Sequence, residues 1–538
     1  MAEVDSWKYK LGTLDKRIKA FAEGYRQNIA LLGDDDQEIS YLLNNYLSVR
    51  RVDSLIYIHV TTAYIDRKNF LKSITISLLG EYVGIHDTFD ALLNHTQALL
   101  PLTVAAIKET FRRSSPPTFL EILEIINKFI NESGRKCVFI IEDFLGLKKL
   151  FPNFHHDFSK FIILQRNCMV ILAAMNIKES QTTLYSDLNL LFGSFEKILL
   201  SETDPVEAYA ILREHLLGLN CSPFFVSFFF NILGANTMYY QLMKDVIRDS
   251  YCADDEVRAI TVAIKKLLYN NESYFFQRFI AHIRLIEATC KSSGILPRFL
   301  VAMSEGYLRE KELLSLHFME AKDLRIKLQK LSDMNYVESL GTLYRLKDPL
   351  FSFWLSHVFA VSFLPPVMDA KKREILFQKK LYESIVLFKT QFNQDNVSKI
   401  IDLLSSFKND TVRIGKDKYR LPLIEKSRVL SYPEKDAHFL IGEGKEILFI
   451  AVKEHCADDA DIFDFVEKSS SIKGKNVKKI FISLERFSST ARLTAKNNKL
   501  IAWDLHELDD LLRMYHKPII TCERRITDAI TSENFSNC

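Results

Sequence analysis

A glycine and a serine with the spacing of a phosphate-binding loop follow the first apolar run of this sequence. Gly33 ends the run IALLG, and Ser40 stands seven residues later, at the end of the segment GDDDQEIS. In loops of the form GxxxxGK[ST], backbone amides and the lysine bind the phosphates of a nucleotide, while the hydroxyl binds magnesium. Gly33 and Ser40 are therefore candidate residues of a phosphate site, and ATP with Mg²⁺ is its candidate ligand.

The interior of this loop departs from the motif at the positions that decide its charge. Glu38 replaces the second glycine, and Ile39 replaces the lysine. Three consecutive aspartates, Asp34, Asp35 and Asp36, add negative charge where a triphosphate would lie. Like charges a few ångströms apart in a partly dry site cost several kcal/mol at an effective dielectric constant of about 20. Tight phosphate binding in the usual pose is therefore not expected, and no cofactor is assigned firmly.

A second apolar run, VFIIED over residues 138–143, ends in two carboxylates. At the end of such a strand, Glu142 and Asp143 could hold magnesium and orient an attacking water. The order is the reverse of the usual one, with the glutamate before the aspartate. Apolar strands that end in an acid are also common without any such site, so the functional and the structural interpretation both stay open.

The C-terminal segment KDAHFLIGEGKEILFIAVKE carries Asp436 and Lys453 on successive predicted strands. It resembles the restriction-endonuclease-like PD-(D/E)XK fold, in which an aspartate on one strand and ExK on the next bind a metal and polarise the scissile phosphate. Ala451 stands in place of the middle carboxylate, which removes one of the few protein ligands of a magnesium ion. We therefore expect no metal site and no cleavage, since Glu446 or Glu454 could substitute only from a different strand position.

A helical segment, EAKDLRIKLQKLSDMNYV, combines an apolar stripe with a group of basic residues. Leu324, Leu328 and Leu331 recur at helical spacing and are expected to be buried. The basic side chains left for the other faces are Lys322, Arg325, Lys327 and Lys330. In a helix-turn-helix unit such side chains can neutralise DNA phosphates, but on an amphipathic helix they often form only a solvated face. DNA contact and a packing role both stay open.

The elements that must position these residues alternate along the first half of the chain. Short apolar runs, separated by amphipathic segments, lie at residues 29–33, 54–60, 136–144 and 169–175. This alternation is typical of βαβ units with a parallel sheet that is buried on both faces. From about residue 202 the pattern becomes helical, and Asp204 can cap a helix whose first residue is Pro205.

Composition limits the possible partners and compartments. The 538 residues exceed what one hydrophobic core usually organises. The formal charge of +3 predicts no global attraction to nucleic acid, so any such contact must come from a local patch. The eight cysteines include no CxxC pair, and the charged start MAEVDSWKYK lacks an apolar signal region. These features favour free thiols in the cytoplasm.

The uncharged stretch over residues 219–243 is long enough to cross a bilayer. It contains four side-chain amides, a proline and a glycine, which are costly in lipid or interrupt a spanning helix. A helix pair buried in a lid domain explains the stretch better, and we expect no membrane partner.

Several segments together resemble the archaeal-type AAA+ ATPases of the STAND group, which often carry a winged helix and a nuclease-like C-terminal domain. The resemblance includes MVILAAM, LFGSFEKILLS, ETDPVEAYAILREHL and ILGANTMYYQL. DPLFSFWL over residues 348–355 closely matches the family's DPLFRFW signature and is the most specific match. Four positions depart from the family pattern. Ala173 replaces a polar residue, Ser194 an arginine, Ala235 a glycine and Thr237 a proline.

The resemblance implies an α/β protein with a P-loop AAA+-like parallel sheet, a helical lid, a winged helix and a C-terminal restriction-endonuclease-like α/β domain. The winged helix would consist of PRFLVAMSEG, REKELLSL and the basic helix, followed by the wing VESLGTLYRLKD. We predict a core over residues 1–201, a lid over 202–292 and a winged helix over 293–362. A helical linker over 363–415, a nuclease-like domain over 416–519 and a tail over 520–538 follow.

Two hypotheses about function follow from these motifs. The first is a degenerate AAA+/STAND ATPase-like protein with weak or absent ATP hydrolysis, acting as a regulatory or scaffolding factor. It would bind double-stranded DNA through the winged helix, or protein partners. The second is a divergent ATPase that still cycles with Ser40, Glu142 and Asp143.

Overall fold

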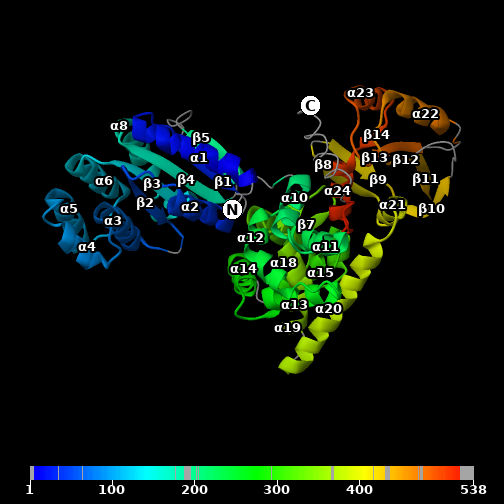
Figure 1. The fold of residues 1–538 in the computed structure, drawn as a ribbon, viewed down its shortest axis with the longest axis horizontal. Helices are drawn as coiled ribbons and strands as arrows, with labels where there is room; N and C mark the ends of the chain where they lie inside the picture. The colour runs from blue at the N-terminus through cyan, green and yellow to red at the C-terminus, as the bar shows by residue number, and fades with distance from the viewer. Residues whose placement is uncertain are drawn as a thin grey trace. The chain divides into compact units, whose positions relative to one another are not determined.

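The computed structural model divides the chain into two compact units, unit 1 (Met1–Glu202) and unit 2 (Thr203–Cys538) (Figure 1). The residues that the structure describes are 5–33, 36–63, 65–175, 177–186, 195–200, 203, 205–291, 294–364, 369–415, 417–430, 437–470, 472 and 477–520.

Unit 1 contains a five-stranded parallel sheet with the strand order β2-β3-β4-β1-β5. Its strands are β1 (Asn28–Gly33), β2 (Leu55–Thr61), β3 (Lys136–Glu142), β4 (Cys168–Met175) and β5 (Phe195–Leu200). The four predicted apolar runs are therefore strands. Because the connections leave β1 and β4 in opposite directions, the switch point at which open α/β sheets bind ligands lies at the carboxyl ends of these two strands.

Both faces of this sheet are buried, as the apolar runs predicted. Successive strand residues point to opposite faces, so Ile29 and Leu31 pack with α1 and α2 while Ala30 and Leu32 pack with α3 to α6 and α8. Figure 1 shows helices on both sides of the sheet. The helices of unit 1 are α1 (Asp5–Glu23), α2 (Asp36–Val49), α3 (Arg67–Val83), α4 (Phe89–Thr96), α5 (Pro101–Arg112), α6 (Phe119–Ser133), η1 (Phe144–Gly146), α7 (Leu147–Leu150), α8 (Phe154–Leu164) and α9 (Ile177–Ser186).

Unit 2 begins with a helical lid whose first helix starts at Pro205, as predicted. Asp204, its predicted cap, lies outside the described residues. The uncharged stretch forms parts of two short buried helices, and no helix among the described residues is long and apolar enough to cross a membrane. The lid elements are α10 (Pro205–His215), α11 (Pro223–Leu233), α12 (Thr237–Ser250), α13 (Glu256–Ile264), the π-helix η3 (Lys265–Tyr269) and α14 (Tyr274–Cys290).

A winged helix follows the lid. The predicted leucine stripe on its third helix is buried. Asp348 caps the DPLFSFWL helix by accepting the amides of Leu350 and Phe351, and it also accepts the Tyr239 hydroxyl of the lid at 2.7 Å. The elements are α15 (Ile295–Ser304), α16 (Glu310–Leu314), α17 (Ala321–Asp333), β6 (Val337–Ser339), β7 (Tyr344–Leu346), α18 (Pro349–Trp354), the π-helix η4 (Leu355–Phe359) and α19 (Ala360–Ser362).

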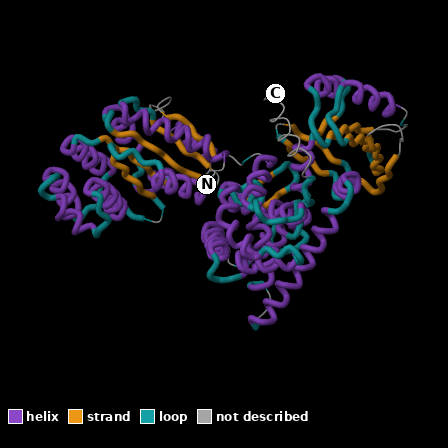
Figure 2. The backbone as a smooth tube through the Cα atoms, in the orientation of Figure 1, coloured by secondary structure: helices purple, strands orange, loops and turns teal. Residues whose placement is uncertain are grey.

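Two helices, a hairpin and a mixed five-stranded sheet with three further helices complete unit 2 (Figure 2). The sheet has the order β10-β11-β12-β13-β14, antiparallel for its first three strands and parallel for the last three. The elements are α20 (Ala370–Phe392), α21 (Asn396–Leu404), β8 (Asp410–Ile414), β9 (Asp417–Leu421), β10 (Ile424–Leu430), β11 (Ala437–Gly444), β12 (Ile447–Lys453), α22 (Asp459–Ser470), β13 (Val477–Ser483), α23 (Ser489–Asn497), β14 (Ile501–Trp503) and α24 (Leu505–Met514). Strand β8 lies within the segment predicted as a helical linker.

The predicted α/β architecture is thus confirmed, with a parallel sheet covered on both faces, a helical region, a winged-helix arrangement and a second sheet at the C-terminal end. The wing also makes a contact that the sequence did not indicate. Its tip lies against β8, where Gly341 pairs with Val412 and the Thr342 amide donates to the Thr411 carbonyl at 2.8 Å. Gly341 has a φ of +94°, and a Cβ at this position would lie 2.0 Å from the Thr411 carbonyl oxygen.

We expect Gly341→Ala to destabilise unit 2 by about 3 kcal/mol or more, because strain and a backbone clash act together. Gly306→Ala is the matched control, since Gly306 has a φ of +99° but open space around the missing Cβ. The control should lose only the ~1–2 kcal/mol of left-handed backbone strain. Urea unfolding of the full chain measures both, and equal losses would show that the wing does not depend on this close approach.

Candidate functional site

The carboxyl edge of the unit 1 sheet brings together two of the predicted site residues. Ser40 lies in the first turns of α2, and Glu142 ends β3. The Ser40 hydroxyl donates a hydrogen bond to Glu142 Oε2. Gly33 ends β1, which β4 separates from β3 in the sheet. A hydroxyl and a carboxylate in this relation could share a magnesium ion, but here they bond to each other.

His59, which was not identified from the sequence, forms a hydrogen bond with the other carboxylate oxygen of Glu142. Its Nε2 lies 2.5 Å from Glu142 Oε1. Strands β2 and β3 pair with His59 beside Ile140, which lies on the sheet face that α2 covers. Glu142 is two residues after Ile140 on β3, so its side chain is on the same face as that of His59. Burial raises the pKa of Glu142, but the hydrogen bonds from His59 and Ser40 outweigh it and hold that pKa below its ordinary value. A polar residue inside the apolar run SLIYIHV was the available signal.

Asp143, the second predicted acid, contacts Thr62, just after the end of β2. Its backbone is left-handed, with a φ of 52°, and its carbonyl accepts a hydrogen bond from the Thr62 hydroxyl. Gly146 permits this turn, because a Cβ there would lie 2.2 Å from Thr62 Oγ1. Ser40, Glu142 and Asp143 therefore do not form one group in this structure.

The side chain at the lysine position of the loop is part of the hydrophobic core. Ile39 is 3% exposed and packs with Leu42 and Leu43 beneath α2. A Cβ on Gly33 would lie 3.2 Å from Ile39 Cγ1, so the isoleucine lies directly against the end of β1. Asp34 and Asp35 lie outside the described residues. Within the described part of the loop, position 39 supplies no cation for a phosphate.

The four basic residues predicted on the third winged-helix element do not form one free surface. Lys322 and Lys330 are exposed on α17. Arg325 is 67% exposed but forms an ion pair with Glu310 of α16 at 2.8 Å. Lys327 donates to the carbonyl of Cys290, at the last residue of α14, at 3.4 Å. Two of the four cations therefore contribute to packing within the domain.

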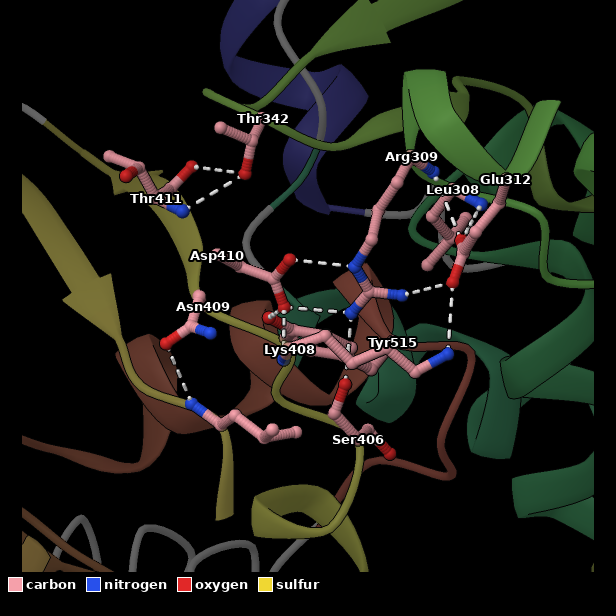
Figure 3. Close-up of polar contacts among 11 residues, drawn as sticks. Leu308, Arg309, Glu312, Thr342, Ser406, Lys408, Asn409, Asp410, Thr411 and Tyr515 are labelled. Carbon is pink, nitrogen blue, oxygen red and sulfur yellow. Dashed lines mark hydrogen bonds and ion pairs between the residues drawn. The ribbon is translucent and has the colours of Figure 1, made fainter. Parts of the chain in front are cut away.

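A buried ionic cluster joins the winged helix to the C-terminal part of unit 2 (Figure 3). Arg309, just before α16, binds both oxygens of Asp410 at the start of β8, each at 2.7 Å. Its remaining donors reach Glu312 at 2.8 Å and the Ser406 carbonyl at 2.9 Å. The planar guanidinium suits this two-point contact with a carboxylate.

Asp410 is 2% exposed and accepts further hydrogen bonds from the Lys408 amide at 3.0 Å and the Tyr515 hydroxyl at 2.8 Å. Burial raises the pKa of Asp410, but the hydrogen bonds from Arg309, Lys408 and Tyr515 outweigh it and hold that pKa below its ordinary value. Segments before α16, at β8 and after α24 thus meet at one carboxylate. Neither Arg309 nor Asp410 was identified from the sequence.

In the C-terminal sheet, the position of the missing carboxylate is fully apolar. Ala451 is 0% exposed and pairs with Phe439 and Phe481 on the neighbouring strands. Lys453 ends the same strand and forms an ion pair with Asp461 of α22. Asp461 also accepts the amide of Asp458 at 3.0 Å, so it is held in the first turn of its helix.

The other acids considered for this site are engaged elsewhere. Glu446 lies at the opposite end of β12 from Lys453 and pairs with Lys478 at 2.9 Å. Glu454 accepts a hydrogen bond from Asn396 at 3.2 Å. Asp436 lies outside the described residues. Across the part of the chain that is described, no group of three or more His, Cys, Asp or Glu side chains could hold a metal ion.

Comparisons with known proteins show only distant likeness. No family model and no curated protein matches the chain. A Walker-type ATPase of Pyrococcus abyssi is 15% identical and aligns with 63% of this chain and 94% of its own, at a TM-score of 0.43. The ORC2 protein of Aeropyrum pernix, solved with ADPNP and ADP, is 12% identical over 69% of this chain and 93% of its own, at 0.41. The ORC1 protein of the same organism, in complex with DNA, is 10% identical over 66% and 94%, at 0.34. The assignments above rest on the chain's own strand order and contacts.

Replacing Asp410 by Asn should destabilise unit 2 by about 2–4 kcal/mol, because the Arg309 guanidinium would remain buried with only Glu312 as its charged partner. Glu338→Gln is the control, since the Arg345–Glu338 pair on the wing is partly exposed and should contribute no more than about 1 kcal/mol. The ionised Asp410 stabilises the fold above the carboxyl's unfolded pKa, and this contribution is lost as the pH falls through the lower folded pKa. Urea unfolding at several pH values should therefore show less acid sensitivity in Asp410→Asn, and an unchanged profile would contradict the assignment.

Ala451→Glu should lower the stability of unit 2 by roughly 2–4 kcal/mol without creating nuclease activity, because the new carboxylate would be buried among aromatic rings. Ala370→Glu is the control at an exposed helix start and should be nearly neutral. Thermal unfolding and incubation with duplex DNA in Mg²⁺ or Mn²⁺ measure the two effects. Cleavage gained by Ala451→Glu would show that the site lacks only this one carboxylate.

Proposed function

We propose that this chain is an AAA+-like binding factor that does not turn over ATP and acts as a scaffold or regulator. The burial of Ile39 at the lysine position is the observation that carries the proposal. A charged lysine binds phosphates because it reaches into the loop, whereas Ile39 lies in the core beneath α2. The residues present do not fit a tightly held Mg²⁺ and ATP pair.

The state of Glu142 supports the same proposal. In a working site this carboxylate would hold the metal through one of its oxygens. Here Ser40 and His59 occupy both oxygens, so a metal would have to displace hydrogen bonds that hold the pKa of the carboxyl low. Asp143 is bonded to Thr62 and is not aimed at the same position.

The partner that we propose is double-stranded DNA, bound through unit 2. A winged helix presents its third helix and its wing to duplex DNA in the usual arrangement. The exposed Lys322 and Lys330 on α17 supply part of the charge that such a contact needs. Protein partners are the alternative if no salt-dependent DNA binding is found.

We further propose that the C-terminal sheet is a nuclease-like domain without cleavage activity. Three antiparallel strands, a helix and a parallel strand follow one another in it. The apolar setting of Ala451 and the ion pair of Lys453 with Asp461 support the inactive interpretation. Such a domain would contribute binding surface rather than chemistry.

One observation favours the second hypothesis, a divergent ATPase. Ser40 and Glu142 do come together at the carboxyl edge of the sheet, as a magnesium site requires. Ligand binding could exchange their mutual hydrogen bond for a metal, so turnover must be measured directly.

We expect the full chain, with or without duplex DNA, to hydrolyse ATP in Mg²⁺ more slowly than about 10⁻³ per second, well under the ordinary range that begins near 1 per second. The reason is the missing cation at position 39. Any residual turnover should be the same in Glu142→Gln, which keeps the size of the side chain. Turnover near 1 per second that Glu142→Gln abolishes would overturn the proposal and establish the divergent ATPase.

A further inference from the structure

The tip of the wing is covered by the chain itself. Gly341 and Thr342 continue the edge of β8, and the Thr342 hydroxyl also accepts the Thr411 amide at 2.9 Å. The buried Arg309–Asp410 pair fixes the start of β8 beside the winged helix (Figure 3). In a free wing, backbone and side-chain groups can bind DNA. In this wing, the backbone at Gly341 and the Thr342 hydroxyl bond to β8 instead.

The hairpin that covers the wing has one buried face and one basic face. Along β8 the residues at 410, 412 and 414 are buried, while Arg413 between them is exposed. On β9, Lys418 and Arg420 are exposed. The pairing places Arg413 opposite Lys418 and Thr411 opposite Arg420, so these four side chains share one face of the hairpin.

The charge on this face is largely uncompensated. Like charges directly opposite each other on neighbouring strands are destabilising, yet Arg413 and Lys418 form such a pair. Among the described residues neither has an acidic partner within ion-pair distance. Arg420 lies 3.7 Å from Glu446, but Lys478 holds the same carboxylate more closely at 2.9 Å. An anion from outside would relieve this repulsion.

The chemistry of the face fits the phosphate backbone of a duplex. Arginine, lysine and threonine side chains are the groups that contact DNA phosphates, and Thr342 and Thr411 lie at the border between the hairpin and the wing. The hairpin face carries no exposed large apolar side chain that would favour a protein partner.

We propose that the solvent face of the β8–β9 hairpin, with Arg413, Lys418 and Arg420, binds the phosphate backbone of double-stranded DNA in place of a free wing. This inference rests on the proposed DNA partner and specifies the surface that holds it. The hairpin and the wing then form one surface, which the Arg309–Asp410 pair keeps in position on the winged helix.

The test compares variants of the full chain in fluorescence-anisotropy titrations of a labelled DNA duplex at several salt concentrations. Arg413→Ala/Lys418→Ala should flatten the slope of log affinity against log salt by about 2 and weaken binding roughly 50-fold at 0.1 M salt, as expected for two lost phosphate contacts. Its thermal stability should stay equal or rise, because a repulsive pair is removed.

Lys371→Ala/Lys496→Ala is the charge-matched control, since both lysines are exposed and belong to other elements, α20 and α23. It should leave the slope within about half a unit of the wild type, because it removes the same charge without removing a contact. Lys322→Ala/Lys330→Ala tests the α17 surface separately.

The outcomes separate the two proposals. If the slope changes only in Lys322→Ala/Lys330→Ala, the chain binds DNA but the hairpin inference is wrong. An equal change in the hairpin variant and the charge-matched control also overturns it, because the effect would then follow net charge alone. If the wild type shows no salt-dependent binding, the proposed DNA partner itself is wrong. A slope change confined to the hairpin variant, with stability retained, supports the inference.

Discussion

The buried contact between Arg309 and Asp410 is the interaction on which the arrangement of unit 2 depends. Two charges removed from water stabilise a protein only when their remaining hydrogen-bonding groups are also satisfied. Here Asp410 receives hydrogen bonds from Arg309 and Tyr515, which are distant in sequence, and from the nearby Lys408 amide. Arg309 uses its other donors on Glu312 and Ser406. Because these partners come from the winged helix, the hairpin and the segment after α24, the cluster forms only when all three are in place. It therefore specifies one relative position for them.

The same principle describes the motif residues of both candidate catalytic sites, whose charged groups bond to other side chains of the protein. A carboxylate or an amine that serves chemistry must keep one side free for its ligand. Glu142 instead bonds to Ser40 and His59, and Lys453 bonds to Asp461. Internal partners of this kind remove the need for a metal or a phosphate, since the charged group is already solvated by the protein. Ile39 and Ala451 are apolar residues at positions where the two motifs hold a charged residue. Their presence is consistent with these internal partners of Glu142 and Lys453.

Much of the architecture could be predicted from local patterns. The apolar runs predicted four of the five strands of the first sheet, β1 to β4, because a parallel sheet covered on both sides needs continuous apolar residues. The leucine stripe of α17 also follows from helical spacing. The strand β8 was missed, since five residues with only alternating polarity inside a helical region carry too weak a signal.

The sequence by itself determined which chemistry is missing, because the absence of a lysine at position 39 and of an acid at position 451 can be seen without coordinates. Only the tertiary structure decided what takes its place. His59 and Glu142 are 83 residues apart, and Arg309 and Asp410 are 101 residues apart. Partnerships across such distances depend on strand register and on how helices pack, which no local spacing encodes. For the same reason, four basic residues that look equivalent on one helix differ in the fold, where Arg325 and Lys327 are held by neighbours and Lys322 and Lys330 are exposed.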